Sequence, residues 1–249
     1  RLYTKEEICE VQAYAHKRQM IVIPEVETPG HVSALLAAYP EFGCTGGPYE
    51  VQDRWGIFNE VLCAGNDAML AFFEDAIAQV ATLFSDPYIH IGGDECPQSA
   101  WEACPKCQAR MKAEGLTGEH QLQSWLTSQI CAMVHKNGKR PIGWDEVLDG
   151  TEEMGNLGVS TLRQVASFTA TPPQMDEQAK SMVLGAQGNL WSERVLSARQ
   201  AEYLLFPRLQ LLAQQLWNPR EADENLNRIE LLTKYCEKLD IHCYRGAVE

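Results

Sequence analysis

The sequence lacks a long uncharged apolar run and has few basic residues. None of its apolar stretches approaches the roughly 18 residues of a membrane-spanning helix. There are 21 basic residues against 34 acidic ones, so the formal net charge is −13. This excess of negative charge is a poor match for a nucleic-acid backbone or an anionic membrane surface. We therefore expect neither a nucleic-acid partner nor a membrane span.

The sequence also lacks a signal peptide and an even number of cysteines. The first residues, RLYTKEEI, lead into a helix start rather than an apolar leader. We expect the chain to be cut from a longer one, together with its targeting information. Nine cysteines cannot all pair within one chain. Cys9 and Cys131 occupy apolar helix positions, and we expect both to be buried thiols.

Short apolar runs alternate with helical patterns along the chain. The predicted strands cover residues 20–26, 88–93, 140–144 and 182–191, with 159–165 as a weaker strand. Helix starts are predicted at Thr4, Asn66 and Ser197, one helix covers residues 119–136, and a late helix kinks or restarts at Pro207. Alternating buried strands and amphipathic helices are typical of an α/β fold with a parallel sheet. The length of 249 residues suits a single domain over 1–249.

Polar and aromatic residues gather directly after the predicted strands. They form four groups, at residues 25–31, 94–95, 144–146 and 191–193. Parallel α/β folds place their sites at the carboxyl ends of the strands. The sequence therefore predicts that these four segments converge on one face.

Asp94 and Glu95 stand side by side at the end of an apolar strand. The preceding Gly92 and Gly93 allow a bend that turns both side chains into one pocket. Two close carboxyl groups do not both ionise cheaply, so we expect one pKa to rise, as a general acid requires. The alternative is that one carboxylate caps the next helix while the other is solvated.

Tryptophans at two strand ends, Trp144 and Trp191, favour a sugar as the ligand. A flat indole ring suits the apolar face of a sugar ring, although a single tryptophan is more often a core residue. Carboxyl groups together with tryptophans indicate glycoside chemistry.

Five blocks in order resemble the family 20 glycoside hydrolases, the β-N-acetylhexosaminidases, and above all their bacterial, Bacteroides-type members. The blocks are PEVETPGH (24–31), HIGGDE (90–95), GWDEVLD (143–149), LGAQGNLWSE (184–193) and YLLFPRLQLLAQQLW (203–217). The resemblance implies a TIM (β/α)8 barrel that removes terminal β-linked N-acetylglucosamine or N-acetylgalactosamine from glycans. It implies a periplasmic or secreted location, and neither a cofactor nor a metal at the site.

The resemblance also implies hydrolysis assisted by the substrate, in which the 2-acetamido oxygen attacks the anomeric carbon. Glu95 matches the general acid and base, and Asp94 matches the residue that orients the acetamido group. His31 matches a histidine near the acid; a structural histidine is the alternative for His31 and for His90. A retaining enzyme with a carboxylate nucleophile is the mechanistic alternative, and it predicts a second carboxylate about 5 Å from Glu95.

Four further residues match substrate-binding positions of the family. Trp144 and Trp191 match walls around the N-acetyl methyl group and the sugar face, and Glu193 matches a carboxylate that binds sugar hydroxyls. Glu27 stands where the family usually has aspartate, which moves its carboxyl group by roughly one carbon–carbon bond.

Parts of the family domain have no counterpart in this sequence. The first two strands, one with a sugar-binding arginine, and a strand–helix–strand segment between Asp149 and about Leu162 are missing. We therefore expect an incomplete barrel, whose apolar edges a second copy could cover as a homo-oligomer. A non-catalytic carbohydrate-binding protein is the functional alternative.

The cysteines leave two interpretations open. Cys104 and Cys107, with Cys96, form part of a possible zinc site or a redox pair, but a single C-x-x-C is weak support. A disulfide between Cys44 and Cys63 across the long loop is favoured if the protein is exported.

Overall fold

The computed structural model describes residues 2–54, 56–144, 147, 160–173, 175–192 and 195–246. The chain divides into two compact units, Arg1–Met154 and Gly155–Glu249, which are described separately. Whether the two units form the single domain predicted over residues 1–249 stays a prediction.

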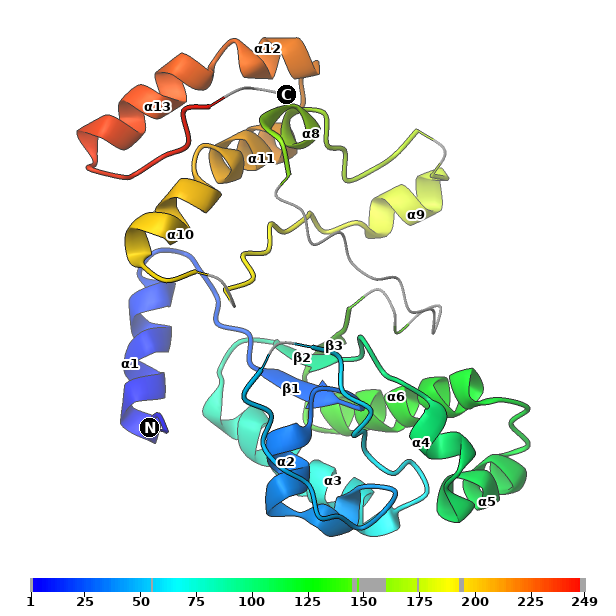
Figure 1. Cartoon of the computed structure of the whole chain (residues 1–249). Helices are drawn as coiled ribbons and strands as arrows, with labels where there is room; N and C mark the ends of the chain where they lie inside the picture. Colours follow the sequence, from blue (N-terminus) through cyan, green and yellow to red (C-terminus); the bar gives the residue numbers. More distant parts are fainter. Residues whose placement is uncertain are drawn as a thin grey trace. The chain divides into compact units, whose positions relative to one another are not determined.

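The first unit contains a parallel sheet with helices around it (Figure 1). Its elements are α1 (Lys5–His16), β1 (Glu25–Thr28), α2 (Ser33–Ala38), the 3-10 helix η1 (Pro40–Phe42), α3 (Asp67–Leu83), β2 (Tyr88–Gly92), α4 (Ser99–Glu102), α5 (Pro105–Glu114), α6 (Glu119–Lys136) and β3 (Arg140–Ile142). The strands lie in the order β1-β2-β3 and run parallel. The predicted α/β class with a parallel sheet is therefore confirmed.

The core of this unit lies between the sheet and the helices. Ile89 and Ile91 of β2 are buried, and both belong to one hydrophobic cluster with Ile130 and Val134 of α6. His90, between the two isoleucines, points to the other face because strand side chains alternate. The helices thus cover one face of the sheet and leave His90 on the opposite one.

The helix starts follow local capping chemistry. Thr4 forms the predicted capping box with Glu7, and the side chain of Asn66 accepts hydrogen bonds from the amides of Ala68 and Met69. Helix α6 spans Glu119–Lys136, as the sequence predicts.

Two strand boundaries and two burial predictions were wrong. The apolar run 20–24 precedes β1 instead of forming it, because the side chain of Asp86 accepts a hydrogen bond from the Val22 amide at 3.0 Å. The strand predicted over 140–144 ends at Ile142. Cys9 is exposed, because α1 buries only Gln12 and Ala15, and Cys131 is half-buried.

The second unit is helical in its described residues. Its elements are α8 (Leu162–Ala166), α9 (Glu177–Met182), α10 (Ala198–Leu205), α11 (Arg208–Trp217), α12 (Ala222–Leu226) and α13 (Ile229–Lys238). Helices α11 and α12 pack on α8, and the buried side chain of Gln215 donates a hydrogen bond to the carbonyl of Ala166 at 2.7 Å. The helix restarts after Pro207, as predicted.

Both strands predicted in the second unit were wrong. Residues 162–165 of the predicted strand lie in α8 instead, because Thr161 and Gln164 form a capping box that begins a helix, and residue 159 lies outside the described residues. Of the strand predicted over 182–191, residue 182 ends α9 and residues 183–191 form no strand, and none of the strands among the described residues pairs with them.

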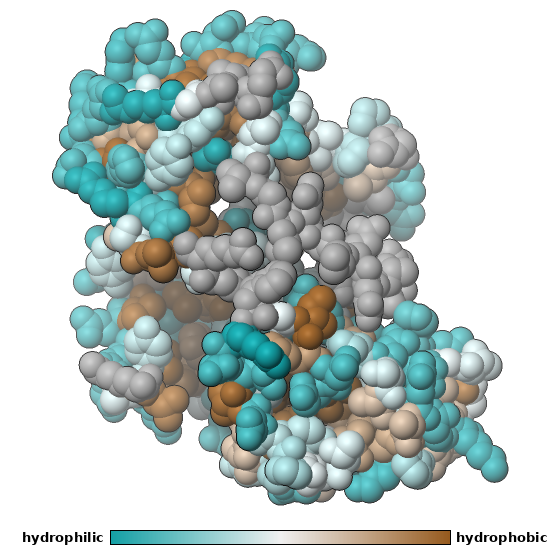
Figure 2. All heavy atoms as spheres, in the orientation of Figure 1, coloured by the Kyte–Doolittle hydropathy of each residue, from teal (hydrophilic) through white to brown (hydrophobic). Residues whose placement is uncertain are grey.

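Hydrophobic residues also reach the surface, as brown atoms in Figure 2 show. In the first unit they include Met20, Ile21 and Ile23 of the run before β1. In the described part of the chain, no helix combines the length and apolar character needed to cross a membrane.

Candidate active site

Three strand ends lie side by side at one edge of the sheet. The register pairs Thr28 with Gly92 and His90 with Ile142, so the segments after β1, β2 and β3 are neighbours. They carry His31, then Asp94 and Glu95, then Trp144. Three of the four segments that the sequence predicts to converge are therefore together.

Two glycines shape the turn between β2 and the carboxylates. Gly92 and Gly93 have φ angles of +70° and +107°, which side chains disfavour. A Cβ at Gly92 would lie 2.0 Å from Oε2 of Glu27, and one at Gly93 equally close to the Val147 side chain. Gln123 of α6 fixes the turn by donating a hydrogen bond to the Gly93 carbonyl at 3.1 Å.

Asp94 and Glu95 face the same imidazole. Nε2 of His31 lies 3.4 Å from Oδ2 of Asp94 and 3.4 Å from Oε2 of Glu95. His31 and Glu95 both have positive φ angles, +53° and +45°. Such strained backbone in non-glycine residues concentrates at functional sites.

The backbone of the segment after β1 lies against the backbone of the segment after β2. A Cβ at Gly30 would lie 3.0 Å from the carbonyl oxygen of Glu95 and 3.1 Å from that of Asp94. The PGH turn therefore leaves little room for a side chain at this position, where it brings His31 against the carboxylates.

The site holds one cation and one neutral acid at neutral pH. The hydrogen bond that the His31 imidazole donates to the Asp94 carboxylate, helped by the charge of Asp94, raises the pKa of His31 to about 9. Burial, followed by the charges of Asp94 and Glu25, raises the pKa of the Glu27 carboxyl to about 8. The predicted pKa difference between Asp94 and Glu95 themselves stays a prediction.

Two carboxyl oxygens at the site are buried without a hydrogen-bond partner among the described residues. They are Oε2 of Glu27 and Oδ1 of Asp94. Buried acceptors are nearly always satisfied in folded proteins, so Oδ1 of Asp94 is available to a donor such as water or a bound ligand.

Trp144 is anchored beside the carboxylates by a residue that the sequence analysis did not assign. Its Nε1 donates a hydrogen bond to Oε1 of Glu25 at 3.1 Å, and its ring lies 4.8 Å from that of His90. Glu25 also lies 3.1 Å from Nδ1 of His90. The alternation of β1, which places Glu25 and Glu27 on one face, was the signal that could have found it.

The remaining predicted residues lie elsewhere in the chain. Trp191 belongs to the second unit and is exposed, and Glu193 lies outside the described residues. Their predicted role at the sugar stays a prediction.

Known proteins with similar sequences share these segments. The chain matches the family described as glycosyl hydrolase family 20, catalytic domain, over residues 1–161 and 150–220. It is 35% identical to a β-hexosaminidase of Porphyromonas gingivalis over 96% of this chain and 37% of that protein. It is 30% identical to a β-hexosaminidase of Vibrio furnissii over 85% of this chain and 43% of that protein.

Solved structures show the same fold. The chitobiase of Flavobacterium johnsoniae superposes with a TM-score of 0.85 at 27% identity, over 96% of this chain and 43% of that one. A β-N-acetylhexosaminidase of Bacteroides fragilis superposes with a TM-score of 0.82 at 24% identity, over 98% of this chain and 58% of that one. The chain thus spans less than two thirds of these proteins.

The predicted incomplete barrel is confirmed. The chain superposes on part of the TIM-barrel catalytic domain of these relatives, and its described residues form three parallel strands. The two family matches meet at residues 150–161, where the sequence predicts a missing segment. This chain belongs to glycoside hydrolase family 20.

Proposed function

We propose that the chain carries the catalytic carboxyl groups of an enzyme that removes terminal β-linked N-acetylhexosamine from glycans. The observation that carries the proposal is the arrangement of Asp94 and Glu95 around His31, with Oδ1 of Asp94 buried and unpartnered. The names of the curated relatives, β-hexosaminidases, support the same substrate class.

Glu95 acts first as an acid and then as a base. It protonates the glycosidic oxygen while the acetamido oxygen of the same sugar attacks the anomeric carbon, which breaks the glycosidic bond and forms an oxazolinium ion. The Glu95 carboxylate then takes a proton from water, whose oxygen opens that ion at the anomeric carbon. Two displacements on opposite faces retain the configuration.

Asp94 orients the acetamido group. Its unpartnered Oδ1 accepts a hydrogen bond from the acetamido N–H, and its negative charge offsets the positive charge of the oxazolinium ion. His31, charged at neutral pH, holds Oδ2 of the same carboxylate. Trp144, fixed by Glu25, forms an apolar wall for the N-acetyl methyl group.

The neutral Glu27 keeps the negative charge of the site on Asp94. With a pKa of about 8 it remains protonated at neutral pH and adds no repulsion to the neighbouring carboxylate. We propose that Trp191 and Glu193 complete the sugar site. The periplasmic or secreted location and the homo-oligomer stay predictions.

Hydrolysis of two matched substrates tests the proposal. An aryl β-N-acetylglucosaminide should be cleaved and the matching β-glucoside should not, because only the first has an acetamido group. The Glu95→Gln and Asp94→Asn variants should each lose about 10²–10⁴-fold in kcat/KM. Glu102→Gln, an exposed change on α4, is the matched control and should keep full activity.

Two results would contradict the proposal. Equal cleavage of the β-glucoside would point to a carboxylate nucleophile instead of the acetamido group. A folded but inactive chain that still binds N-acetylglucosamine would support the carbohydrate-binding alternative, which family membership does not favour.

A further inference from the structure

Four cysteine sulfurs from three segments meet away from the catalytic carboxylates. Cys44 follows η1, Cys63 precedes α3, and Cys104 and Cys107 lie at the start of α5. All four Sγ atoms lie within 4.8 Å of one another. We call this group the four-cysteine cluster.

The sulfur–sulfur distances fit ligands of one shared ion. Sγ of Cys63 lies 3.7 Å from that of Cys104 and 3.7 Å from that of Cys107, and Cys44 lies 3.8 Å from Cys107. A disulfide bond needs about 2.05 Å. Zinc–sulfur bonds of about 2.3 Å at the tetrahedral angle place the sulfurs about 3.8 Å apart.

The surroundings suit thiolates bound to a metal. Cys63, Cys104 and Cys107 are buried within the hydrophobic cluster of the first unit, and Cys44 is half-buried. Cys104 is the N-cap residue of α5, whose helix dipole favours negative charge at that end. Thiolate sulfur in a tetrahedral set of four is the donor set that selects zinc or iron.

The backbone holds the ligand segments together independently of the sulfurs. The amide of Cys63 donates to the carbonyl of Phe42 at 2.8 Å, next to the segment that carries Cys44. Gly65 lies so close to α5 that a Cβ there would be 2.2 Å from the carbonyl of Lys106. The fold thus brings the four sulfurs together rather than leaving them to meet by chance.

We propose that Cys44, Cys63, Cys104 and Cys107 bind a single zinc ion as a closed structural site. Four protein ligands leave no open position, which distinguishes the site from a catalytic zinc centre. The ligand set differs from the one considered from the sequence, because Cys96 is outside the cluster. It also replaces the predicted Cys44–Cys63 disulfide, which the structure does not form.

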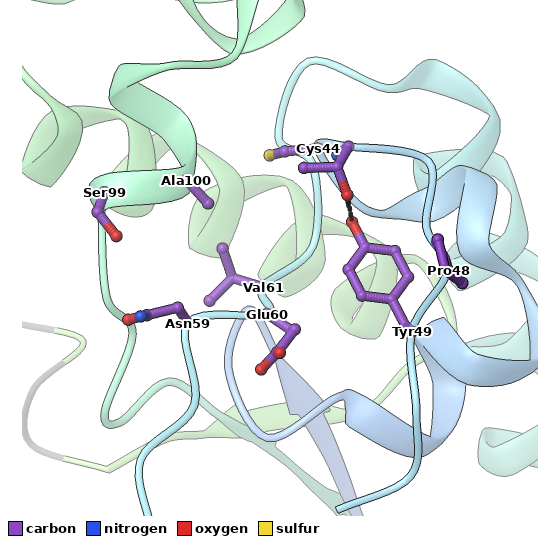
Figure 3. Close-up of a pocket in the computed structure, with 9 residues that line it drawn as sticks. Cys44, Pro48, Tyr49, Asn59, Glu60, Val61, Ser99 and Ala100 are labelled. Carbon is purple, nitrogen blue, oxygen red and sulfur yellow. Dashed lines mark hydrogen bonds between the residues drawn. The ribbon is translucent and has the colours of Figure 1, made fainter.

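A pocket borders the cluster at Cys44. Figure 3 shows Cys44 at its wall, with Tyr49, Glu60 and Ser99 among the other lining residues. Its volume is about 390 Å³. The hydroxyl groups of Thr45 and Tyr49 lie 2.8 Å apart and hold the loop that carries Cys44.

The zinc ion would position the catalytic segment without touching substrate. The amide of Leu62, next to Cys63, donates to the carbonyl of Pro29 at 3.0 Å, two residues before His31. The buried indole of Trp101 donates to the Leu62 carbonyl at 2.8 Å. The cluster therefore fixes the loop that supports the PGH turn.

Metal analysis of the chain tests the proposal without any activity assay. Purified under reducing conditions with zinc present, the chain should contain a single zinc ion, and the Cys63→Ser and Cys104→Ser variants should lose it. Cys131→Ser is the matched control, since Cys131 lies outside the cluster, and it should keep the ion. Cobalt in place of zinc should give the intense visible bands of a tetrahedral thiolate site.

Zinc removal should also lower the thermal midpoint. A strong chelator should reduce Tm by at least about 5 °C in the unmodified chain and not in Cys104→Ser. If that variant does not fold, release of zinc from the unmodified chain by a thiol-specific mercurial decides the matter.

Three results would overturn the proposal. They are iron instead of zinc on elemental analysis, a zinc content well below one per chain, and a mass deficit of about 2 Da per bridge that shows a disulfide among the four cysteines. Loss of glycosidase activity alone would not overturn the zinc proposal, because the zinc measurement does not depend on the proposed function.

Discussion

At the scale of single residues, His31 allows two carboxylates to lie side by side at the end of β2. Its imidazole is 3.4 Å from both Asp94 and Glu95, and its raised pKa of about 9 keeps it charged at neutral pH. Without that charge, two partly buried carboxylates would repel each other in a medium of reduced dielectric constant. The same positive charge lies against the carboxylate to which we assign the acetamido group.

Replacing His31 should therefore destabilise the fold. His31→Ala removes the counter-charge of Asp94, and we expect the free energy of unfolding at pH 7 to fall by about 1–3 kcal/mol. Urea denaturation measures the change. The control is His135→Ala, an exposed site on α6, and equal losses in the two variants would contradict the prediction.

Glu27 should make stability depend on pH. Its pKa rises from 4.5 to about 8 on folding, so the native state binds the proton more tightly and stability falls as pH rises through that window. His31, raised from 6.5 to about 9, adds a further fall between those values.

The Glu27→Gln variant isolates the first effect. Its free energy of unfolding, relative to the unmodified chain, should increase steadily between pH 4.5 and 8, because glutamine has no proton to lose. Urea titrations at several pH values measure this difference. A difference that stays constant with pH would show that Glu27 does not titrate in this way.

At the scale of elements, close backbone contacts join the loops to α5. Gly65 leaves no room for a side chain against Lys106 and Cys107. Asn66 follows it, caps α3 and also donates to the carbonyl of Glu41 at 2.7 Å. Two adjacent residues thus connect the loops before α3 to two different elements.

A methyl group at Gly65 should disturb this contact. Gly65→Ala places Cβ against backbone atoms that cannot move aside, so we expect a loss of about 1–3 kcal/mol in the free energy of unfolding. Gly118→Ala is the control, because a Cβ there meets no atom within 4 Å. If the two variants unfold at the same denaturant concentration, the contact does not limit stability.

The two roles of Asn66 should separate in a pair of variants. Asn66→Ala loses the cap and should cost about 1 kcal/mol, whereas Asn66→Asp keeps the capping oxygen and loses only the donor to Glu41. Thermal unfolding should rank Asp between Asn and Ala. If the Asn66→Asp variant is as unstable as Asn66→Ala, the hydrogen bond to Glu41, and not the helix cap, is what stabilises the fold.

At the scale of the whole molecule, the negative net charge and the exposed apolar side chains act in opposite directions on self-association. The charge makes copies of the chain repel each other, whereas the apolar side chains favour contact between them. The chain carries a formal charge of −13, while Met20, Ile21 and Ile23 before β1 are exposed. Like charges keep molecules apart over a Debye length, which salt shortens from about 10 Å at 0.1 M to about 3 Å at 1 M. We therefore expect any self-association of the chain to depend on ionic strength.

We expect the average mass in solution to rise with salt at pH 7 and as pH approaches the isoelectric point of about 4.9. Analytical ultracentrifugation measures it. Ile21→Lys and Ile23→Lys should suppress the rise, and a mass that ignores salt in the unmodified chain would contradict the prediction.

The sequence by itself determined those features that depend on residues close together in the chain. Capping residues such as Thr4 and Asn66, the helix break at Pro207 and the order of the strand-end motifs depend on neighbours in the chain, so each is visible in the sequence. Five motifs in order, among them the one that carries Asp94 and Glu95, were together enough to predict the family. The start of the strand predicted at 20–26 was wrong, because the side chain of Asp86, from a distant loop, accepts a hydrogen bond from the Val22 amide.

Only the tertiary structure decided which individual side chains touch within the sites. Cys44 and Cys104 are separated by 60 positions, and Glu25 and Trp144 by 119, so no local periodicity relates them. The raised pKa of Glu27 likewise depends on burial and on Asp94, which folding brings close. Sequence pattern fixes local geometry, whereas burial and electrostatic coupling arise only when the strand ends and loops pack together.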